Sequence, residues 1–221
     1  LVRRLLSIGG TFRVHLTSLM PVYVTPELIE LYHDDKMVKH LHLSLQSGSN
    51  GILERMNRPY TREDFLSLVG RIRSAVPDFN FTTDIIVGFP GETEGDFLDT
   101  MGLIDGVGFS HVHTFRYSPR PGKKAASMED TVTEAEKKER SGRVIGLSAA
   151  LKLRYYGRFN GRESTFLSER SGGGITTGFN EYYAPVEVSD KLQRNEFFTV
   201  KTHLEEGKQA LNGIVIGKRD R

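Results

Sequence analysis

Residues 82–93 read TTDIIVGFPGET, and this stretch decides the fold. A β-rich run stops at Gly88, a proline stands between Gly88 and Gly91, and an acidic residue and a threonine open the next segment. This order is typical of a buried strand that passes through a tight turn into a helix. Glycine at both positions lets a ligand approach the backbone closely. An ordinary strand-to-helix turn accounts for the same local pattern.

Units of the same kind lie on both sides of this stretch. Strand-like runs are expected at residues 12–19, 40–46, 79–87 and 110–117. Helices are expected at residues 25–33, 50–56, 61–75, 93–105 and 133–156. The alternation predicts an α/β fold with parallel strands and right-handed crossover connections. Because four strands cannot close the usual eight-stranded barrel, we expect an open sheet or part of a larger barrel.

Side chains in these strands alternate between apolar and polar types. Leu41, Leu43 and Leu45 are expected to face the covering helices, since a strand points successive side chains to opposite faces. The inward face then carries His15, Thr17, His40, His42, Ser44, Gln46, Thr82, Asp84, Ile86, His111, His113, Phe115 and Tyr117. Polar inward residues near the carboxyl ends of parallel strands are typical of an α/β-barrel active site. For any single histidine, a hydrogen-bonded core position is an equal alternative.

The composition excludes several classes of protein. The 221 residues are 38% hydrophobic and 26% charged with a net charge of +2, which indicates a globular domain and neither demands nor excludes nucleic acid. There is no cysteine, so these residues build no disulfide, zinc–thiolate site or cysteine-ligated iron–sulfur cluster. This fits a reducing, cytoplasmic location. No apolar run is long enough to span a membrane, and the missing initiator methionine suggests a fragment.

The pattern changes after Phe159. Short β-like runs appear at residues 163–168, 182–188, 197–202 and 213–216, separated by turns rich in glycine, asparagine and charge. Such spacing predicts a small antiparallel barrel or sandwich. We therefore expect one domain over residues 1–157 and a second over residues 158–221.

Three long segments carry a family resemblance. They read HLHLSLQSGSNGILERMNRPYT at residues 40–61, TTDIIVGFPGETEGDF at residues 82–97 and FRYSPRPGKKAA at residues 115–126. In order and spacing they resemble the catalytic half of the radical-SAM methylthiotransferases. The tail, with GRESTFLSE and GFNEYYAPVEV, resembles the small RNA-binding TRAM barrel of these proteins. HVHTFRYSPRPG and GFNEYYAPV are most similar to the branch that modifies threonylcarbamoyladenosine beside the tRNA anticodon.

The resemblance implies a partial radical-SAM β/α barrel followed by a TRAM-like domain. The intact parent is then a transferase that uses S-adenosylmethionine and two 4Fe–4S clusters to insert a methylthio group into a tRNA adenosine. The cysteine loop that holds the catalytic cluster is absent from these residues. We therefore expect this chain to hold no cluster, to contain no catalytic residue or metal ligand, and to be inactive by itself.

The resemblance also assigns candidate contacts to the cofactor and to RNA. Residues expected at the ribose, adenine or pocket wall of S-adenosylmethionine are Gln46, Ser47, Gly48, Asp84, Ile86, Gly88, Gly91, Phe115 and Tyr117, with Asp84 a contact to either cofactor or substrate. From the residues themselves, the basic loop is expected to contact tRNA phosphates through Arg116, Arg120, Lys123 and Lys124. Tyr182 and Tyr183 are expected to stack on RNA bases, the alternative being a place in the barrel core.

Further alternatives stay open at this point. Arg58 has the guanidinium fork that binds a carboxylate or phosphate, and a plain surface position is equally consistent. The basic residues of the helix at 133–156 are better explained as a solvated, ion-paired face. The chain is alternatively a stand-alone RNA-binding module, an independent α/β enzyme that uses Asp84 and the inward histidines, or part of a methylthiotransferase for isopentenyladenosine or a ribosomal protein. No membrane or DNA partner is expected.

Overall fold

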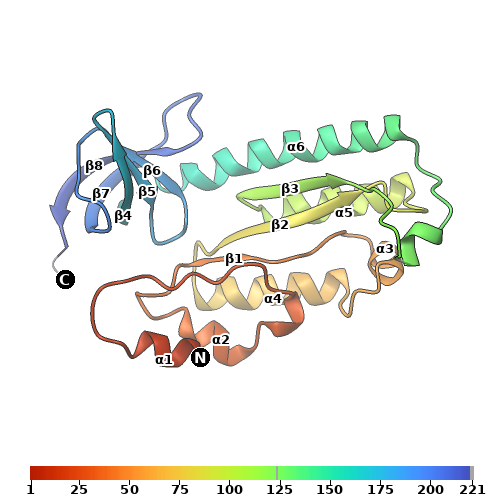
Figure 1. Cartoon of the computed structure of the whole chain (residues 1–221), viewed down its shortest axis with the longest axis horizontal. Coiled ribbons are helices and arrows are strands. Elements are labelled where there is room, and N and C mark those ends of the chain that lie inside the picture. The colour runs from red at the N-terminus through yellow and green to blue at the C-terminus, as the bar shows by residue number, and fades with distance from the viewer. Residues whose placement is uncertain (123, 220–221) are drawn as a thin grey trace.

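The computed structural model describes residues 1–122 and 124–219 (Figure 1). A layer of parallel strands and helices occupies one end of the molecule and a small β-barrel the other. The long helix α6 (Glu134–Gly157) runs from one part to the other. The expected fold class, an open parallel α/β sheet followed by a small, mostly antiparallel barrel, is confirmed.

Three regular strands form the sheet. They are β1 (His40–His42), β2 (Asn80–Val87) and β3 (His111–Arg116), all parallel and in the order β1-β2-β3. The register places His42 beside Thr82 and Asp84 beside His113, so the polar residues of neighbouring strands lie next to one another.

The strand expected at residues 12–19 does not form, and this prediction was wrong. That segment is held only by isolated parallel bridges, from Val14 to Met37 and from Leu19 to Leu43. Ser18 has a φ of 57°, a left-handed conformation that breaks an extended run. The edge of the sheet is therefore irregular where a fourth strand was expected.

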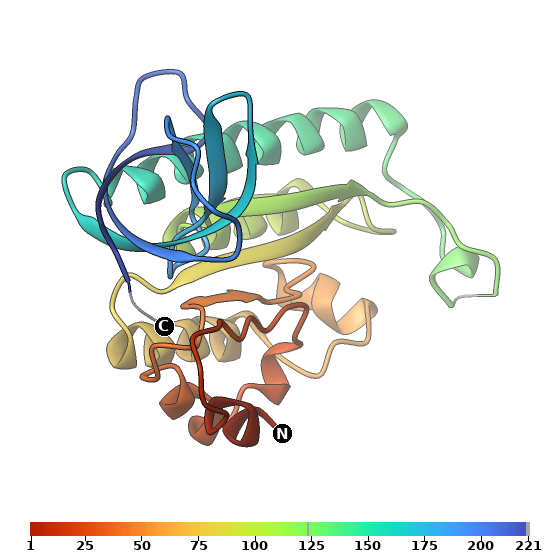
Figure 2. The same ribbon diagram turned by 60° about the vertical axis from the view of Figure 1, so that its left-hand side comes forward.

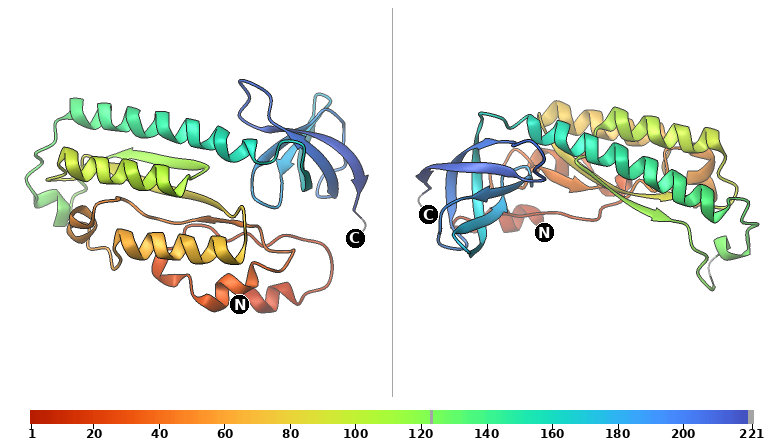
Figure 3. Two further views of the ribbon diagram at one scale, coloured as in Figure 1. Left: turned by 180° about the vertical axis from the view of Figure 1, so that it is seen from behind. Right: turned by 90° about the horizontal axis from the view of Figure 1, so that it is seen from above.

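The helices begin where capping residues predict. Thr61, Thr93 and Thr133 each cap a helix and form a reciprocal capping box with the acidic residue three positions later. These helices are α4 (Arg62–Ala75), α5 (Glu94–Val107) and α6, and they cover the outer side of the sheet (Figure 3). The shorter helices are α1 (Val2–Leu6), α2 (Pro26–Leu31) and α3 (Asn50–Arg55), with 3-10 turns at Pro21–Tyr23 and Lys124–Ser127.

The small barrel closes on itself in the order β4-β5-β6-β8-β7. Its strands are β4 (Glu163–Gly172), β5 (Ile175–Phe179), β6 (Pro185–Val188), β7 (Phe197–His203) and β8 (Leu211–Lys218). All pairs are antiparallel except β6 with β8. Its core also takes in Tyr155, Tyr156 and Phe159, which come from the end of α6 and the turn after it.

The barrel docks against the end of the sheet at which β1 and β2 begin (Figures 1 and 2). The Lys39 amide donates to the carbonyl of Glu181 at 2.8 Å, and the Asn80 side chain donates to the carbonyl of Tyr182 at 2.8 Å. The guanidinium of Arg13 donates to the carbonyls of Phe179 and Thr165. Backbone carbonyls of the barrel thus accept hydrogen bonds from residues of the α/β part.

No helix within the residues that the structure describes is long and apolar enough to cross a membrane.

The burial of Leu43 predicts that shortening this side chain destabilises the protein strongly, whereas shortening an exposed leucine does not. Leu43 is fully buried beneath the helices, whereas Leu98 of α5 is half exposed. We expect Leu43→Ala to lower the free energy of unfolding by about 2–5 kcal/mol, because the cavity adds to the lost burial. Leu98→Ala, the matched control, should change it by less than about 1 kcal/mol. Urea unfolding followed by circular dichroism measures both, and equal effects would contradict the assigned strand phase.

Candidate functional site

A cavity of about 490 Å³ lies at the carboxyl ends of the three strands. Five of the predicted cofactor residues line it, namely Gln46, Asp84, Ile86, Phe115 and Tyr117. The cavity is also lined by Arg58, Phe89, Arg116, Ser118, Arg120 and Ala125. Phe89, Ser118 and Ala125 were not expected, although Phe89 and Ser118 each lie two residues after the end of a strand. The cavity therefore combines apolar walls, an amide, a carboxylate and guanidinium groups.

The other predicted cofactor residues lie in the turns beside the cavity and do not line it. Ser47 is fully buried, and its hydroxyl lies 3.3 Å from that of Thr100 on α5. The Gly48 amide donates to the same threonine hydroxyl at 2.9 Å, and a Cβ at Gly48 would come within 2.6 Å of the Thr100 Cα. These two residues bring the turn after β1 close against α5.

Gly88 and Gly91 also serve close packing of protein groups. Gly88 has a φ of 71° and Gly91 a φ of 77°, which a residue with a side chain adopts only under strain. A Cβ at Gly88 would collide with the stem of Lys137, and one at Gly91 would collide with the guanidinium of Arg55. In this structure the space above both glycines is taken by basic side chains.

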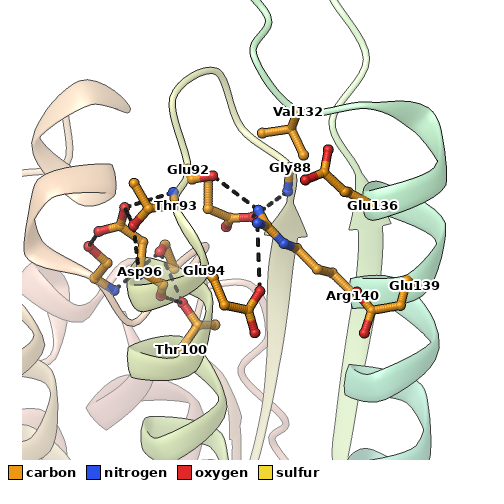
Figure 4. A network of polar contacts seen from close by, with 12 residues as sticks. Gly88, Glu92, Thr93, Glu94, Asp96, Thr100, Val132, Glu136, Glu139 and Arg140 are labelled. Carbon is orange, nitrogen blue, oxygen red and sulfur yellow. Dashed lines mark hydrogen bonds and ion pairs between the residues drawn. The ribbon is translucent and has the colours of Figure 1, made fainter.

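A buried ion pair fixes the same turn to α6 (Figure 4). One carboxylate oxygen of Glu92 accepts from the Gly88 amide at 2.7 Å and from the Arg140 guanidinium at 2.7 Å. Burial raises the pKa of the Glu92 carboxyl, an effect that the Gly88 amide and Arg140 only partly offset. The expectation of a solvated basic face on α6 was wrong here, since Lys137 and Arg140 are buried as well as paired.

The inward face of the sheet carries a cluster of histidines. His42 contacts the carboxylate of Asp84 at 3.1 Å, and His40 and His42 both contact the hydroxyl of Thr82 at 3.0 Å. Burial, with smaller effects of His15 and His42, lowers the pKa of His40 to about 3. Burial and the neighbouring His113 lower the pKa of His111 to about 4. The imidazoles of His40 and His111 are therefore neutral at pH 7. Within the described residues, no group of three or more His, Asp or Glu side chains is arranged to hold a metal ion.

The basic residues that were predicted to contact RNA lie in different surroundings. Arg116 turns toward α6, where its guanidinium lies 4.0 Å from Glu134. Arg120 lines the cavity, and Lys124 is exposed on the loop beyond it. Lys123 lies outside the described residues.

The two tyrosines lie where the barrel meets the sheet. The Tyr183 ring stacks on Phe179 at 4.2 Å and contacts the His15 ring, also at 4.2 Å. Tyr182 packs 5.3 Å from Phe159. Both tyrosine rings therefore pack against other side chains of the protein. The contact between Tyr183 and His15 could not be seen in the sequence, because the two residues are 168 positions apart.

Comparison with known proteins shows which protein families this chain is similar to. Residues 1–104 match the family model of the Radical SAM superfamily. The chain is 41% identical over 203 residues to the threonylcarbamoyladenosine tRNA methylthiotransferase MtaB of Thermotoga maritima, a match that covers 90% of this chain and 47% of that protein. It is 45% identical over 163 residues to a tRNA-2-methylthio-N(6)-dimethylallyladenosine synthase of Thermoanaerobacter sp., covering 73% of this chain and 35% of that protein.

A solved structure shows the same fold at low identity. Coproporphyrinogen III oxidase from Escherichia coli, described as a radical SAM enzyme, superimposes with a TM-score of 0.52 at 17% identity and covers 63% of this chain and 32% of that chain. The chain thus spans less than half the length of these relatives.

The neutral histidines predict a pH dependence of stability. Unfolded histidines take up protons near pH 6.5, whereas folded His40 and His111 do so only near pH 3 and 4. The unfolded state binds more protons in between, so the free energy of unfolding should fall as the pH drops from about 7 to 5, by up to about 1.4 kcal/mol per pH unit for each imidazole. His40→Asn should flatten this slope in urea titrations. Equal slopes for His40→Asn, for the unaltered protein and for the exposed control His33→Asn would refute the assignment.

Proposed function

We propose that this chain, which belongs to the radical SAM superfamily and is related to the tRNA methylthiotransferases, supplies the S-adenosylmethionine pocket of an enzyme that inserts a methylthio group into a modified adenosine of tRNA. The observation that carries the proposal is the cavity at the carboxyl ends of β1, β2 and β3, where an α/β sheet places its ligand. The cofactor supplies radical chemistry and the transferred methyl group when it is bound with an iron–sulfur cluster.

The lining of the cavity fits the adenosyl part of this cofactor. Ile86, Phe89 and Phe115 offer apolar walls for a flat base. The Gln46 amide and the Asp84 carboxylate offer the acceptor and donor groups that ribose hydroxyls require. Tyr117 is held in place because its hydroxyl donates to the Ala125 carbonyl at 2.9 Å and its ring meets Phe89 edge to face.

The residues of this chain do not fit the cluster. The sequence has no cysteine, and the described residues contain no alternative group of ligands. We propose that the 221-residue chain is a fragment of its parent, binds the nucleoside part of the cofactor, and does not cleave it.

For the substrate, we propose threonylcarbamoyladenosine. Arg58 and Arg120 line the cavity, and within the described residues neither has a carboxylate within salt-bridge distance. The threonylcarbamoyl group carries a carboxylate, which a guanidinium binds well, whereas a dimethylallyl group is a hydrocarbon. The dimethylallyladenosine reaction remains the second candidate, favoured by the 45% identity to that synthase.

For tRNA itself, we propose phosphate contacts by the loop that follows β3. Arg120 and Lys124 are exposed there, at the mouth of the cavity. Such contacts weaken steeply with salt, in contrast to the binding of a neutral nucleoside.

Cofactor binding is tested by titrating the 221-residue chain with S-adenosylmethionine in a calorimeter. Asp84→Asn should weaken binding about tenfold, the effect of losing one hydrogen bond that the ligand donates to a charged acceptor. The control Asp190→Asn changes an exposed carboxylate of the small barrel and should bind as the unaltered chain does. The same chain should release no 5′-deoxyadenosine under reducing conditions with added iron and sulfide. Cleavage would refute the proposed inactivity, and equal affinities would remove Asp84 from the pocket.

Substrate choice is tested with two nucleosides, threonylcarbamoyladenosine and dimethylallyladenosine. Arg58→Gln and Arg120→Gln should each weaken binding of the first by about tenfold, as expected for a hydrogen bond between charged groups, and leave the second unchanged. Arg71→Gln, on an exposed position of α4, is the matched control. If the unaltered chain prefers dimethylallyladenosine, the second candidate replaces the first.

A further inference from the structure

A series of four hydrogen bonds crosses the inward face of the sheet. It runs from His15 to His40 at 2.7 Å, from His40 to Thr82 at 3.0 Å, from Thr82 to His42 at 3.0 Å, and from His42 to Asp84 at 3.1 Å. The geometry follows from the strands, because His40 and His42 share one face of β1 and Thr82 and Asp84 share the same face of β2. The parallel register then seats the threonine hydroxyl between the two imidazoles.

A neutral His42 gives the series a single direction. A carboxylate has no proton to donate, so the Nε2 of His42 donates to Asp84, and in the neutral imidazole the Nδ1 then accepts from the Thr82 hydroxyl. That hydroxyl, having donated its proton, accepts from the Nε2 of His40. The Nδ1 of His40 is then an acceptor, and the Nε2 of His15 donates to it. In this arrangement the three imidazoles all carry a proton on Nε2.

The protonation states around the series agree with this assignment. Burial lowers the pKa values of both His15 and His40, so neither carries a charge at pH 7. The groups that face the series from β3 are His111 and His113, and the ring of His113 lies 5.5 Å from that of His42. The phenol that faces it from the small barrel is Tyr183, whose burial raises its pKa.

The two ends of the series lie in different parts of the molecule. At one end, Asp84 lines the cavity, and within the described residues its carboxylate receives a hydrogen bond from His42 alone, through Oδ2. The second oxygen, Oδ1, is left for a ligand. At the other end, the Tyr183 ring lies against both His15 and His40 and is backed by Phe179. Tyr183 has a φ of 60°, so the turn of the small barrel holds its backbone in a left-handed conformation that places the ring there.

We propose that His42, Thr82, His40 and His15 position Asp84 as the acceptor for a hydroxyl or amino group of the bound adenosine, and that Tyr183 holds the far end of this series. Docking of the small barrel is thereby coupled to ligand binding in the cavity. The identity of the ligand rests on the proposed function, whereas the direction of the hydrogen bonds does not. These four residues act through Asp84 and are positioning residues.

The direction is tested by long-range ¹H–¹⁵N spectra of the histidine rings in the labelled 221-residue chain at pH 7. His15, His40 and His42 should all show a protonated Nε2 and an unprotonated Nδ1. Thr82→Val, which keeps the shape of the side chain and removes the hydroxyl, should shift the ring nitrogens of His40 and His42. Thr114→Val, on the other face of β3, is the matched control and should leave them unchanged. A proton on Nδ1 of His42 would overturn the direction.

The coupling is tested by the affinity of the same chain for S-adenosylhomocysteine, the stable demethylated form of the cofactor. Thr82→Val should weaken binding about three- to tenfold, the net effect of one hydrogen bond. Tyr183→Asn, which removes the ring packed against His15 and His40, should weaken binding by a similar factor, and Asn tolerates the left-handed backbone. The Tyr183→Asn variant should also shift the His15 and His40 resonances, which a merely local loss of stability would not do.

The outcomes separate this inference from the proposed function. If the unaltered chain binds S-adenosylhomocysteine and both variants bind it equally well, the coupling is overturned and the proposed pocket stands. If the unaltered chain binds no adenosine nucleoside, both the proposed pocket and the positioning role fail, and the ring spectra alone decide the direction of the series. Weaker binding of both variants, with Thr114→Val unchanged, supports the coupling.

Discussion

The two-residue period of parallel strands is the constraint on which the rest of this structure depends. It sends Leu41, Leu43 and Leu45 into the core under α4, α5 and α6, and it sends the intervening polar residues to the opposite face. The same phase on β2 brings Thr82 and Asp84 beside the histidines of β1. If the register of a strand shifted by one residue, the imidazoles would be buried among the helices and the leucines would be exposed. The same alternation therefore determines both the core and the candidate site.

This period is also why much of the structure was predictable from the sequence. The three strands, the polar face and the helix starts follow from local alternation and from caps such as Thr61. The irregular edge at residues 12–19 was missed because Ser18 adopts a conformation that its sequence does not signal. Strand β5 was missed because ITTGF is short and glycine-containing, and its pairing with β4 and β6 is a tertiary effect. The burial of Arg140 depends on Glu92, which lies 48 residues away.

The glycine-rich turn after β2 is shaped by packing between protein groups. From the sequence, Gly88 and Gly91 were assigned to the cofactor. The structure places Lys137 and Arg55 over them and ties the turn to α6 through Glu92 and Arg140. Removing one partner of such a buried pair typically costs about 3–5 kcal/mol, so the shape of the pocket rim depends on a contact that no ligand makes.

Helix α6 belongs to two hydrophobic cores at once. Its 24 residues extend about 36 Å at the usual rise per residue, with Val144 and Leu151 in the core of the sheet and Tyr155 and Tyr156 in that of the barrel. Two rings of the barrel core therefore lie before residue 158, where the second domain was expected to begin. A cut there would strip two aromatic rings from the barrel, and an exchange of barrels between relatives would have to carry the last turns of this helix with it.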